Sequence, residues 1–329
     1  MTEKPKIVFA CKIADDDARV RLEKVCEPVE VEASKPEELT QHVGDAAGII
    51  VPYTAEPLIT GEVMDAAPQL RLVGTTYGGV RQNVDDTHAL EKGLTVIHTG
   101  ASRVKPMAEY TLALTLSSLL QIHNYHHYMR SGEAWPRTKY PRTRMLQGRS
   151  VGVIGYGRIG KGILDMLRTF TDDLSVQSNH LSEAEARAAG LKKRELEDLF
   201  ASCEIIVLAG GYTSATHHLI RRQHFDAMRE DALFVNIARG KMVNEAEMLA
   251  AVKERPIYLA LDVFEEEPLP ADSPLRENDR VLMTPHRANN PIEFEQRWQT
   301  LADEIESFAC GETPESALTP ERAAAMSGS

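Results

Sequence analysis

The sequence predicts an α/β protein made of two doubly wound parallel-sheet domains, and three observations support this prediction. Short apolar runs alternate with helical patterns along most of the chain, as in βα-repeating proteins. The glycine-rich segment Ser150–Gly162 has the pattern of a strand, a tight turn and an amphipathic helix. The chain has 329 residues, which is long enough for two domains of ordinary size, each with its own core.

The first third of the chain contains the strands of one predicted sheet. They are Ile7–Ala10, Gly48–Val51, Leu70–Gly74 and Leu94–Ile97. The segment Thr75–Asp85 follows the third strand, so we expect it at the carboxyl edge of the sheet, where ligands bind. Gly78 and Gly79 in this segment can offer backbone N–H groups to a carboxylate, but a plain Gly-Gly turn explains them equally well.

A single long helix is predicted from about Lys105 to Arg130, because apolar residues recur there at helical spacing. The histidines of this stretch lack a carboxylate or cysteine that would complete a metal set, so we assign them to the surface or to a subunit interface. They are His123, His126 and His127. The loop formed by Trp135 and Pro136–Met145 is longer than a simple linker needs to be. We expect it to wrap a partner subunit.

The glycine-rich segment predicts a dinucleotide site. Gly155 permits a tight turn, Gly157 lets the backbone approach a pyrophosphate, and Gly160 lets helix and strand pack closely. The intervening residues of this turn would lie beside the anion at the helix N-terminus. They are Tyr156, Arg158 and Ile159. The alternative is a glycine-rich turn that binds no ligand.

The end of the next strand does not decide whether the coenzyme is NAD or NADP. Ser178 and Asn179 stand where an acidic residue would bind the ribose hydroxyls of NAD, and both can hydrogen-bond a hydroxyl or a 2′-phosphate. Glu183 and Glu185 follow and would repel such a phosphate. This pattern favours NAD and leaves NADP as the alternative.

The remaining strands complete a second sheet. They are predicted at Leu174–Ser178, Ile205–Ala209, Leu233–Ile237, Tyr258–Asp262 and Val281–Met283. Helices are expected near Arg221–Met228 and Asn244–Lys253, and a terminal helix contains Trp298 and Phe308. The Ala/Ser/Gly-rich tail after Pro320 is predicted to be disordered.

Composition narrows the class of protein. No apolar run approaches 18 residues and no signal peptide is recognisable, so we expect a cytoplasmic protein. The net charge of −12 argues against a nucleic-acid partner. The cysteines lack metal-ligand spacing, and we expect reduced thiols and no metal site. They are Cys11, Cys26, Cys203 and Cys310.

Three polar residues follow the carboxyl ends of late strands and form a candidate catalytic site. Arg239 can bind a carboxylate bidentately, His286 can exchange a proton near neutral pH, and Glu267 can orient that imidazole. Taken separately, they also fit a turn cation, a member of a solvated acidic run and a loop histidine after proline. Spacing alone does not decide between these interpretations.

Four segments carry a resemblance to a known family. They are Val151–Gly162, Val235–Gly240, Leu261–Leu275 and Thr284–His286. In order and spacing they resemble the NAD(P)-dependent D-2-hydroxyacid dehydrogenase family, and Ala108–Leu114 is similar to that family's helix entering the cofactor domain. The resemblance extends over nearly the whole chain.

The resemblance implies hydride transfer between a nicotinamide coenzyme and a small 2-oxo or 2-hydroxy acid, in a homodimer. Arg239 would hold the substrate carboxylate and carbonyl, His286 would be the general acid/base, and Glu267 its partner. Backbone donors at Gly78 and Gly79 would bind the carboxylate. Coenzyme contacts would include Ala238 and Asp262.

The resemblance also implies the order of the domains along the chain. A Rossmann cofactor domain at residues 103–286 would be inserted into a flavodoxin-like substrate domain formed by residues 1–102 and 287–329. Ser178, Ala209–Gly211, Val104 and Arg287–Pro291 depart from the family pattern, which leaves the coenzyme contacts and the mouth of the site open. A nucleotide-sensing protein of the same fold remains an alternative function.

Overall fold

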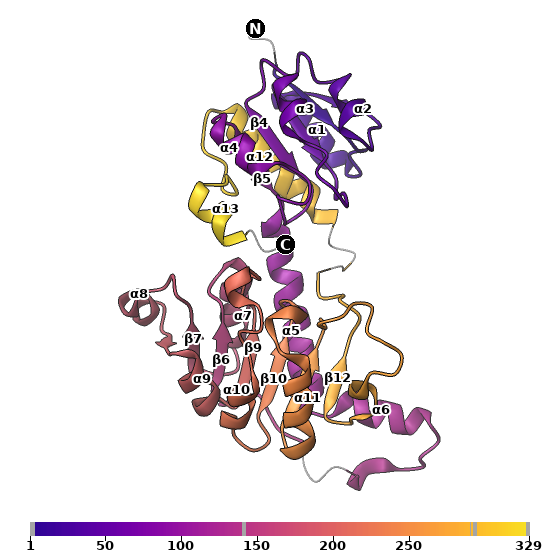
Figure 1. The fold of residues 1–329 in the computed structure, drawn as a ribbon, viewed down its shortest axis with the longest axis vertical. Coiled ribbons are helices and arrows are strands. Elements are labelled where there is room, and N and C mark those ends of the chain that lie inside the picture. The colour runs from indigo at the N-terminus through magenta and orange to yellow at the C-terminus, as the bar shows by residue number, and fades with distance from the viewer. Residues whose placement is uncertain (1–3, 140–142, 290, 292–294, 327–329) are drawn as a thin grey trace. The chain divides into compact units, whose positions relative to one another are not determined.

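The chain folds into two compact units in the computed structural model, which describes residues 4–139, 143–289, 291 and 295–326. Unit 1 comprises Met1–Arg103 and Ile292–Ser327, and unit 2 comprises Val104–Pro291 (Figure 1). Unit 1 is therefore made of two chain segments, between which the whole of unit 2 is inserted. None of the helices in the described ranges is long and apolar enough to cross a membrane.

Unit 1 contains a parallel sheet of five strands in the order β2-β1-β3-β4-β5. The strands are β1 (Lys6–Phe9), β2 (Glu27–Glu30), β3 (Gly48–Val51), β4 (Leu72–Thr75) and β5 (Thr95–His98). Parallel pairing is uniform, with Ile7 opposite Gly48 and Leu72 opposite Thr95. This is the flavodoxin-like strand order, in which ligands bind at the carboxyl edge.

Alternating side chains of these strands build two cores. Ile7 and Phe9 face a core shared with α1 (Asp16–Val25) and α12 (Arg297–Ala309). Val8 faces the other core, together with residues of four short helices. These helices are α2 (Pro36–Thr40), α3 (Gly61–Asp65), α4 (Asp86–Glu91) and α13 (Pro320–Met326). Helices thus cover both faces, as the apolar strands require.

Unit 2 contains seven parallel strands in the order β12-β11-β10-β9-β6-β7-β8. They are β6 (Val151–Ile154), β7 (Leu174–Gln177), β8 (Lys192–Lys193), β9 (Ile205–Leu208), β10 (Leu233–Asn236), β11 (Tyr258–Leu261) and β12 (Val281–Met283). Counted from β6, the order is the doubly wound dinucleotide-binding arrangement with one further strand. The order reverses beside β6, next to the glycine-rich turn.

Helices cover both faces of the unit 2 sheet as well (Figure 1). On one face lie α5 (Val104–Leu119), α7 (Arg158–Leu167) and α8 (Glu183–Ala188). On the other lie α9 (Leu196–Ser202), α10 (Arg222–Ala227) and α11 (Glu245–Glu254). The predicted α/β class and two doubly wound sheets are confirmed.

Two strands were not predicted from the sequence, and both lie at an edge of a sheet. β2 has the sequence Glu-Pro-Val-Glu, and β8 consists of two lysines. Edge strands are paired on one side only and need no apolar run. Neither segment therefore has the hydrophobic pattern from which the central strands were recognised.

The single helix predicted from Lys105 to Arg130 is wrong, because the chain breaks it into α5 and α6 (Ile122–Arg130). Gln121 adopts a left-handed conformation (φ 55°), and its buried side chain donates from Nε2 to the Ser118 carbonyl at 2.6 Å. The Leu119 carbonyl accepts from the Arg144 backbone N–H at 2.9 Å instead of from a continuing helix. These side-chain and long-range bonds end the helix, and hydrophobic spacing does not reveal them.

The disordered tail predicted after Pro320 is also corrected, since Pro320–Met326 forms α13. Proline is favoured in the first turn of a helix, and the Thr319 hydroxyl accepts from the Arg322 backbone N–H at 3.3 Å. Ala323 is buried in a core of unit 1. The buried Ala323 side chain packs this short helix against the rest of unit 1. Residues 327–329 lie outside the described residues.

Candidate active site

The glycine-rich turn joins β6 to the N-terminus of α7. Gly155 has φ +104°, and a Cβ there would lie 2.7 Å from the backbone of Gly210. A Cβ on Gly160 would lie 2.1 Å from the Gly155 carbonyl oxygen, so this position also requires glycine. A Cβ on Gly157, in contrast, would have no atom within 4 Å. The turn is therefore tightly packed on its protein side and open at Gly157, the position where a ligand would approach the helix N-terminus.

Tyr156, Arg158 and Ile159 lie within this turn and the first residues of α7. The backbone N–H groups at a helix N-terminus lack intrahelical partners and attract anions. The turn thus fits the pyrophosphate of a dinucleotide by its shape and by its donors.

Ser178 and Asn179 directly follow β7, the neighbour of β6. Ser178 is buried, and its hydroxyl accepts from the His180 backbone N–H at 3.3 Å. The Asn179 side chain accepts from Gln177 Nε2 at 3.2 Å. Glu185 is held in a capping box, where the Ser182 hydroxyl lowers its pKa. The carboxylate is therefore ionised at the start of α8, close in sequence to the ribose position.

Arg239, Glu267 and His286 follow three strands that are neighbours in the sheet, β10, β11 and β12. The carboxyl ends of parallel neighbours share one edge, so the fold brings these three loops together. The turn that carries Arg239 is fixed by Asn236. Its Oδ1 accepts from the Ala238 N–H at 3.0 Å, and its Nδ2 donates to the Arg239 carbonyl at 3.2 Å. The Arg239 side chain is exposed and donates from Nη1 to the Ala238 carbonyl at 2.7 Å.

Glu267 and His286 form a direct pair. His286 Nδ1 lies 2.7 Å from Glu267 Oε2, and the other carboxylate oxygen accepts from the Phe264 N–H at 2.9 Å. The His286 side chain is 39% exposed and the Glu267 side chain 35% exposed. The imidazole is therefore held by the carboxylate and still accessible to a reactant. With Nδ1 engaged by Glu267, Nε2 is the nitrogen left to exchange a proton with a substrate.

Asp262 organises the loop that carries His286. Its buried carboxylate accepts from the Thr284 hydroxyl at 2.6 Å and from the backbone N–H groups of Arg287 and Ala288, each at 2.9 Å. The His286 N–H donates to the Asp262 carbonyl at 2.8 Å, and His286 adopts a left-handed conformation with φ +52°. Because several bonds hold this unusual backbone geometry, the orientation of the imidazole is fixed by the fold.

Gly78 and Gly79 belong to unit 1, where they follow β4. The Arg103 side chain packs beside Gly78, since a Cβ there would lie 3.1 Å from Arg103 Cδ and Nε. The Arg103 guanidinium lies 3.6 Å from the centre of the Tyr77 ring. Gly79 is open, with no atom closer than 3.8 Å to an added Cβ. Its backbone is thus accessible at the carboxyl edge of the unit 1 sheet.

Several residues that hold these loops were not predicted from the sequence. Asn236 and Thr284 were not singled out, and Glu265 was treated only as part of an acidic run, whereas it binds His218 with Nε2 to Oε1 at 2.6 Å. The available signal was their position, since Asn236 ends β10, and Thr284 and Glu265 follow β12 and β11. Among the described residues, no group of three or more histidine, cysteine or acidic side chains is placed to hold a metal ion.

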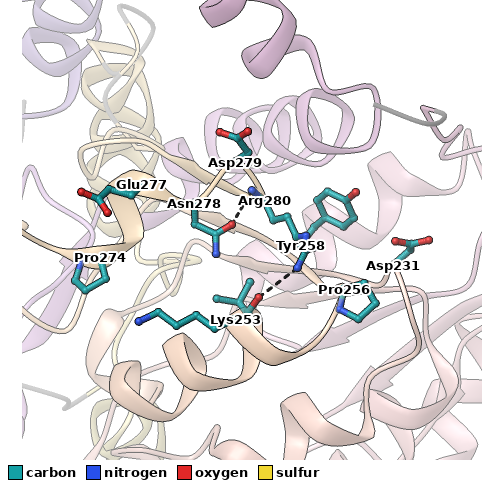
Figure 2. Close-up of a pocket in the computed structure, with 10 residues that line it drawn as sticks. Asp231, Lys253, Pro256, Tyr258, Pro274, Glu277, Asn278, Asp279 and Arg280 are labelled. Carbon is teal, nitrogen blue, oxygen red and sulfur yellow. Dashed lines mark hydrogen bonds between the residues drawn. The ribbon is translucent and has the colours of Figure 1, made fainter. Parts of the chain in front are cut away.

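A cavity of about 780 Å³ lies at the amino ends of the strands of the unit 2 sheet, between α11 and the starts of β11 and β12 (Figure 2). Its lining includes Tyr258, the first residue of β11, and Arg280, which precedes β12. In Figure 2 the Arg280 backbone N–H donates to Asn278 Oδ1 at 3.0 Å. Open α/β sheets place their chemistry at the carboxyl ends of strands, so this cavity is separate from the candidate active site.

Known proteins of one family are similar to this chain over most of its length. Residues 112–288 match the family model described as D-isomer specific 2-hydroxyacid dehydrogenase, NAD binding domain. A glyoxylate reductase from Thermofilum pendens is 31% identical and aligns over 91% of this chain and 89% of its own length. A D-3-phosphoglycerate dehydrogenase from Methanocaldococcus jannaschii is 31% identical over 95% of this chain, which spans 59% of that relative. The solved structure of a protein from Pyrococcus horikoshii OT3 has a TM-score of 0.78 and 27% identity, covering 97% of this chain and 96% of its own.

Proposed function

Because the chain belongs to the D-isomer specific 2-hydroxyacid dehydrogenase family, we propose that it reduces small 2-oxo acids with Arg239, Glu267 and His286 as its catalytic residues. The family carries out hydride transfer between a nicotinamide coenzyme and a 2-oxo or 2-hydroxy acid, and this chain is an oxidoreductase of that type. The observation that carries the proposed roles is the 2.7 Å contact between His286 and Glu267. No observation favours the nucleotide-sensing alternative.

The proposed roles follow from the chemistry of the three side chains. The Arg239 guanidinium binds the substrate carboxylate through two parallel hydrogen bonds and stabilises the negative charge that develops on the carbonyl oxygen. His286 donates a proton from Nε2 to that oxygen during reduction and takes it back during oxidation. Glu267 holds Nδ1, so that Nε2 is the nitrogen turned toward the substrate. Gly79, with Gly78, offers backbone donors to the substrate carboxylate.

The coenzyme would be held along the carboxyl edge of the unit 2 sheet. The residues proposed to hold it are Gly155, Tyr156, Gly157, Arg158, Ile159, Gly160, Ser178, Asn179, Ala238 and Asp262. The open backbone at Gly157 and the N-terminus of α7, whose N-cap Gly157 provides no side-chain hydrogen bond, support the pyrophosphate position. When bound, the nicotinamide supplies the hydride.

NAD is the proposed coenzyme in preference to NADP. Glu185 is ionised near the predicted ribose position, and its charge disfavours a 2′-phosphate. Fluorescence titration with NADH and NADPH tests this preference. We expect tighter binding of NADH, and tighter binding of NADPH would contradict the proposal and direct attention to Arg158 or Arg187 as a phosphate partner.

The substrate is proposed to be a small 2-oxo acid such as glyoxylate or hydroxypyruvate. The Thermofilum pendens relative named glyoxylate reductase, which aligns over nearly its full length, supports this class. Purified protein should be assayed with glyoxylate, hydroxypyruvate, pyruvate and bulkier 2-oxo acids, with each coenzyme in turn. Loss of absorbance at 340 nm with the smaller acids is expected. Coenzyme binding without turnover of any acid would contradict the proposed reaction.

A homodimer is proposed, with the helical stretch from about Lys105, which is divided into α5 and α6, and the loop from Trp135 to Met145 in its interface. Residues 140–142 of this segment lie outside the described residues. The remainder carries four large apolar side chains that are 49–73% exposed, which a monomer would leave in water. They are Ile122, Met129, Trp135 and Met145. Light scattering at micromolar concentration should give twice the mass of the chain, Trp135→Glu should lower it, and a monomeric mass for the wild type would contradict the proposal.

A cytoplasmic location is proposed as well. All four cysteines are free thiols, which supports a reducing compartment. Fractionation of cells that produce the protein tests this location, and recovery outside the cytoplasm would contradict it.

A further inference from the structure

A second histidine–glutamate pair lies at the same edge of the unit 2 sheet as Glu267 and His286. Nε2 of His218 lies 2.6 Å from Oε1 of Glu265, and the two side chains are 25% and 35% exposed. His218 lies in the connection from β9 to α10, and Glu265 follows β11. The pair therefore joins two loops that are far apart in the sequence.

The backbone around His218 is bonded to the chain that follows Arg239. The His218 N–H donates to the Lys241 carbonyl at 3.0 Å, and the Ile220 N–H donates to the Met242 carbonyl at 3.0 Å. The Ile220 carbonyl in turn accepts from the Asn244 N–H at 2.9 Å. These bonds make the His218 segment a short parallel extension beside the loop after β10.

The loops after β10 and β11 are themselves in close contact. A Cβ on Gly240 would lie 1.8 Å from the carbonyl carbon and oxygen of Phe264, so the two backbones touch at this glycine. His218 is thus bonded through its backbone to the loop that carries Arg239, and through its side chain to the loop that carries Glu267. A shift of one loop would be transmitted to the other, because packed backbones have little room to relax.

The loop after β11 is placed by contacts of its own acidic residues. The Glu265 N–H donates to Glu245 Oε2, and the Glu245 N–H donates to Glu265 Oε2, both at 3.1 Å. Two residues later, Glu267 binds the Phe264 N–H and His286. Alternate glutamates of one acidic run therefore reach histidines in two other loops. Glu265 contacts His218, and Glu267 contacts His286.

Several acidic side chains lie close together where His218 contacts Glu265. Burial raises the pKa of Glu245, and the neighbouring charges of Glu265 and Glu266 raise it further. Crowded carboxylates repel one another, and a hydrogen bond from His218 Nε2 to Glu265 would offset part of that repulsion. Two further side chains lie beside the pair. Arg221 Nε donates to the His218 carbonyl at 2.9 Å, and the His217 ring stacks on His218 at 4.0 Å.

We propose that His218 and Glu265 are a positioning pair, which holds the loop after β11 so that Glu267 reaches His286 and the adjoining Arg239 turn keeps its place. The inference rests on the proposed function of Arg239, Glu267 and His286. Neither His218 nor Glu265 touches the reacting atoms in this proposal. Their effect on turnover passes through the loops that they hold.

The first test compares His218→Leu and Glu265→Gln with the wild type in 2-oxo acid reduction. A displaced catalytic group lowers turnover steeply, so kcat should fall by roughly 10- to 100-fold. The dissociation constant for NADH should change by less than about twofold, because the glycine-rich turn lies on other strands. His218→Gln keeps an N–H donor toward Glu265 and should recover most of the turnover. His217→Leu, the exposed neighbouring histidine, is the matched control and should leave kcat near that of the wild type.

The division of the effect between kcat and KM gives a second readout. A displaced Glu267 no longer holds His286 Nδ1 in place, so His218→Leu should lower kcat by a larger factor than it raises KM for the 2-oxo acid. Full kcat with an unchanged KM in both His218→Leu and Glu265→Gln would overturn the proposal. Equal losses in His217→Leu and His218→Leu would overturn it too, because they would indicate general loosening of the loop.

Hydrogen exchange separates failure of this inference from failure of the proposed function. If the wild type reduces none of the acids, the proposed function fails, and exchange at residues 262–267 then tests the pair without any assay. His218→Leu should exchange faster there than the wild type and His217→Leu. Unchanged exchange at residues 262–267 would overturn the positioning role.

Discussion

His286 Nδ1 lies 2.7 Å from Glu267 Oε2, although 18 residues of chain, Pro268–Pro285, separate the two side chains. The contact joins the loops after β11 and β12, and each loop is fixed by bonds of its own. Glu267 accepts from the Phe264 N–H, and the His286 N–H donates to the Asp262 carbonyl. The pair is therefore held at the carboxyl edge of the unit 2 sheet by bonds within the protein.

Glu267→Gln should lower kcat and leave part of the activity. A charged carboxylate makes a stronger hydrogen bond to His286 Nδ1 than a neutral amide does, so the imidazole should be held less firmly in the variant. Because the orientation of the proton donor affects turnover more than substrate binding, kcat should fall while KM for the 2-oxo acid changes little. Steady-state kinetics of the variant and the wild type check this prediction. A wild-type kcat would exclude the pairing as a determinant of the histidine's position.

Replacement of His286 should remove the proton donor. The expected loss in turnover is about 10²–10⁴-fold, the usual range for general acid/base catalysis. His286→Asn is the better probe because asparagine tolerates the left-handed backbone (φ +52°) that alanine disfavours. His286→Ala and His286→Asn should both retain coenzyme binding in a fluorescence titration. Turnover within threefold of the wild type in His286→Asn would rule out the assigned role.

Arg239→Lys should fail to rescue the loss caused by Arg239→Ala. A lysine carries the charge, but it cannot make the two parallel hydrogen bonds that a guanidinium makes to a carboxylate. Both variants should raise KM for the 2-oxo acid and lower kcat, because the contact strengthens as charge develops on the carbonyl oxygen. Lys241→Ala, an exposed cation two residues away, is the control. Near wild-type kinetics of Arg239→Lys would point to a simple charge effect.

Alanine at Gly157 and at Gly160 should have different consequences. At Gly160 the new Cβ would lie 2.1 Å from the Gly155 carbonyl oxygen, so the melting temperature should fall and coenzyme binding should be lost with it. At Gly157 nothing lies within 4 Å, so the fold should persist while a methyl group obstructs the pyrophosphate. Thermal unfolding and NADH titration of both variants distinguish the two effects. Normal NADH affinity in Gly157→Ala would place the dinucleotide elsewhere.

Glu245→Gln should raise stability at neutral pH. Burial raises the pKa of Glu245, so the stability contributed by its protonated form is present in acid and is lost as the pH rises through the folded-state pKa. Glutamine stays neutral and keeps an oxygen that can accept from the Glu265 N–H. The melting temperature should rise by about 2 °C at pH 7.5, and the difference should vanish near pH 4.

Glu254→Gln, at the other end of α11, is the control for this prediction. Hydrogen bonding from Arg222 lowers the pKa of Glu254, so the ionised form is the favoured one and its removal should not stabilise the protein. A higher melting temperature in both variants at pH 7.5 would show only that the overall negative charge matters.

The central strands were predictable because their signals are local, and the three catalytic candidates were proposed from their positions after such strands and from the family resemblance. Buried parallel strands such as Ile205–Leu208 are continuous apolar runs, and Arg239 and His286 come just after such runs. Gly160 in the β6–α7 turn is likewise fixed by short-range geometry. At Gly160 the atom that excludes a side chain belongs to Gly155, five residues earlier.

The tertiary structure decided the features that depend on partners distant in sequence. The break at Gln121 needs Arg144 to bind the Leu119 carbonyl, α13 needs a core to receive Ala323, and β2 and β8 need a neighbouring strand. The pairing of His218 with Glu265 depends on two loops that meet only at the folded sheet edge. A sequence specifies such contacts through the whole fold, since long-range hydrogen bonds leave no periodic pattern in the residues that make them. The sequence therefore determined the sheets and the residues at their carboxyl ends, and the tertiary structure decided which of those residues meet.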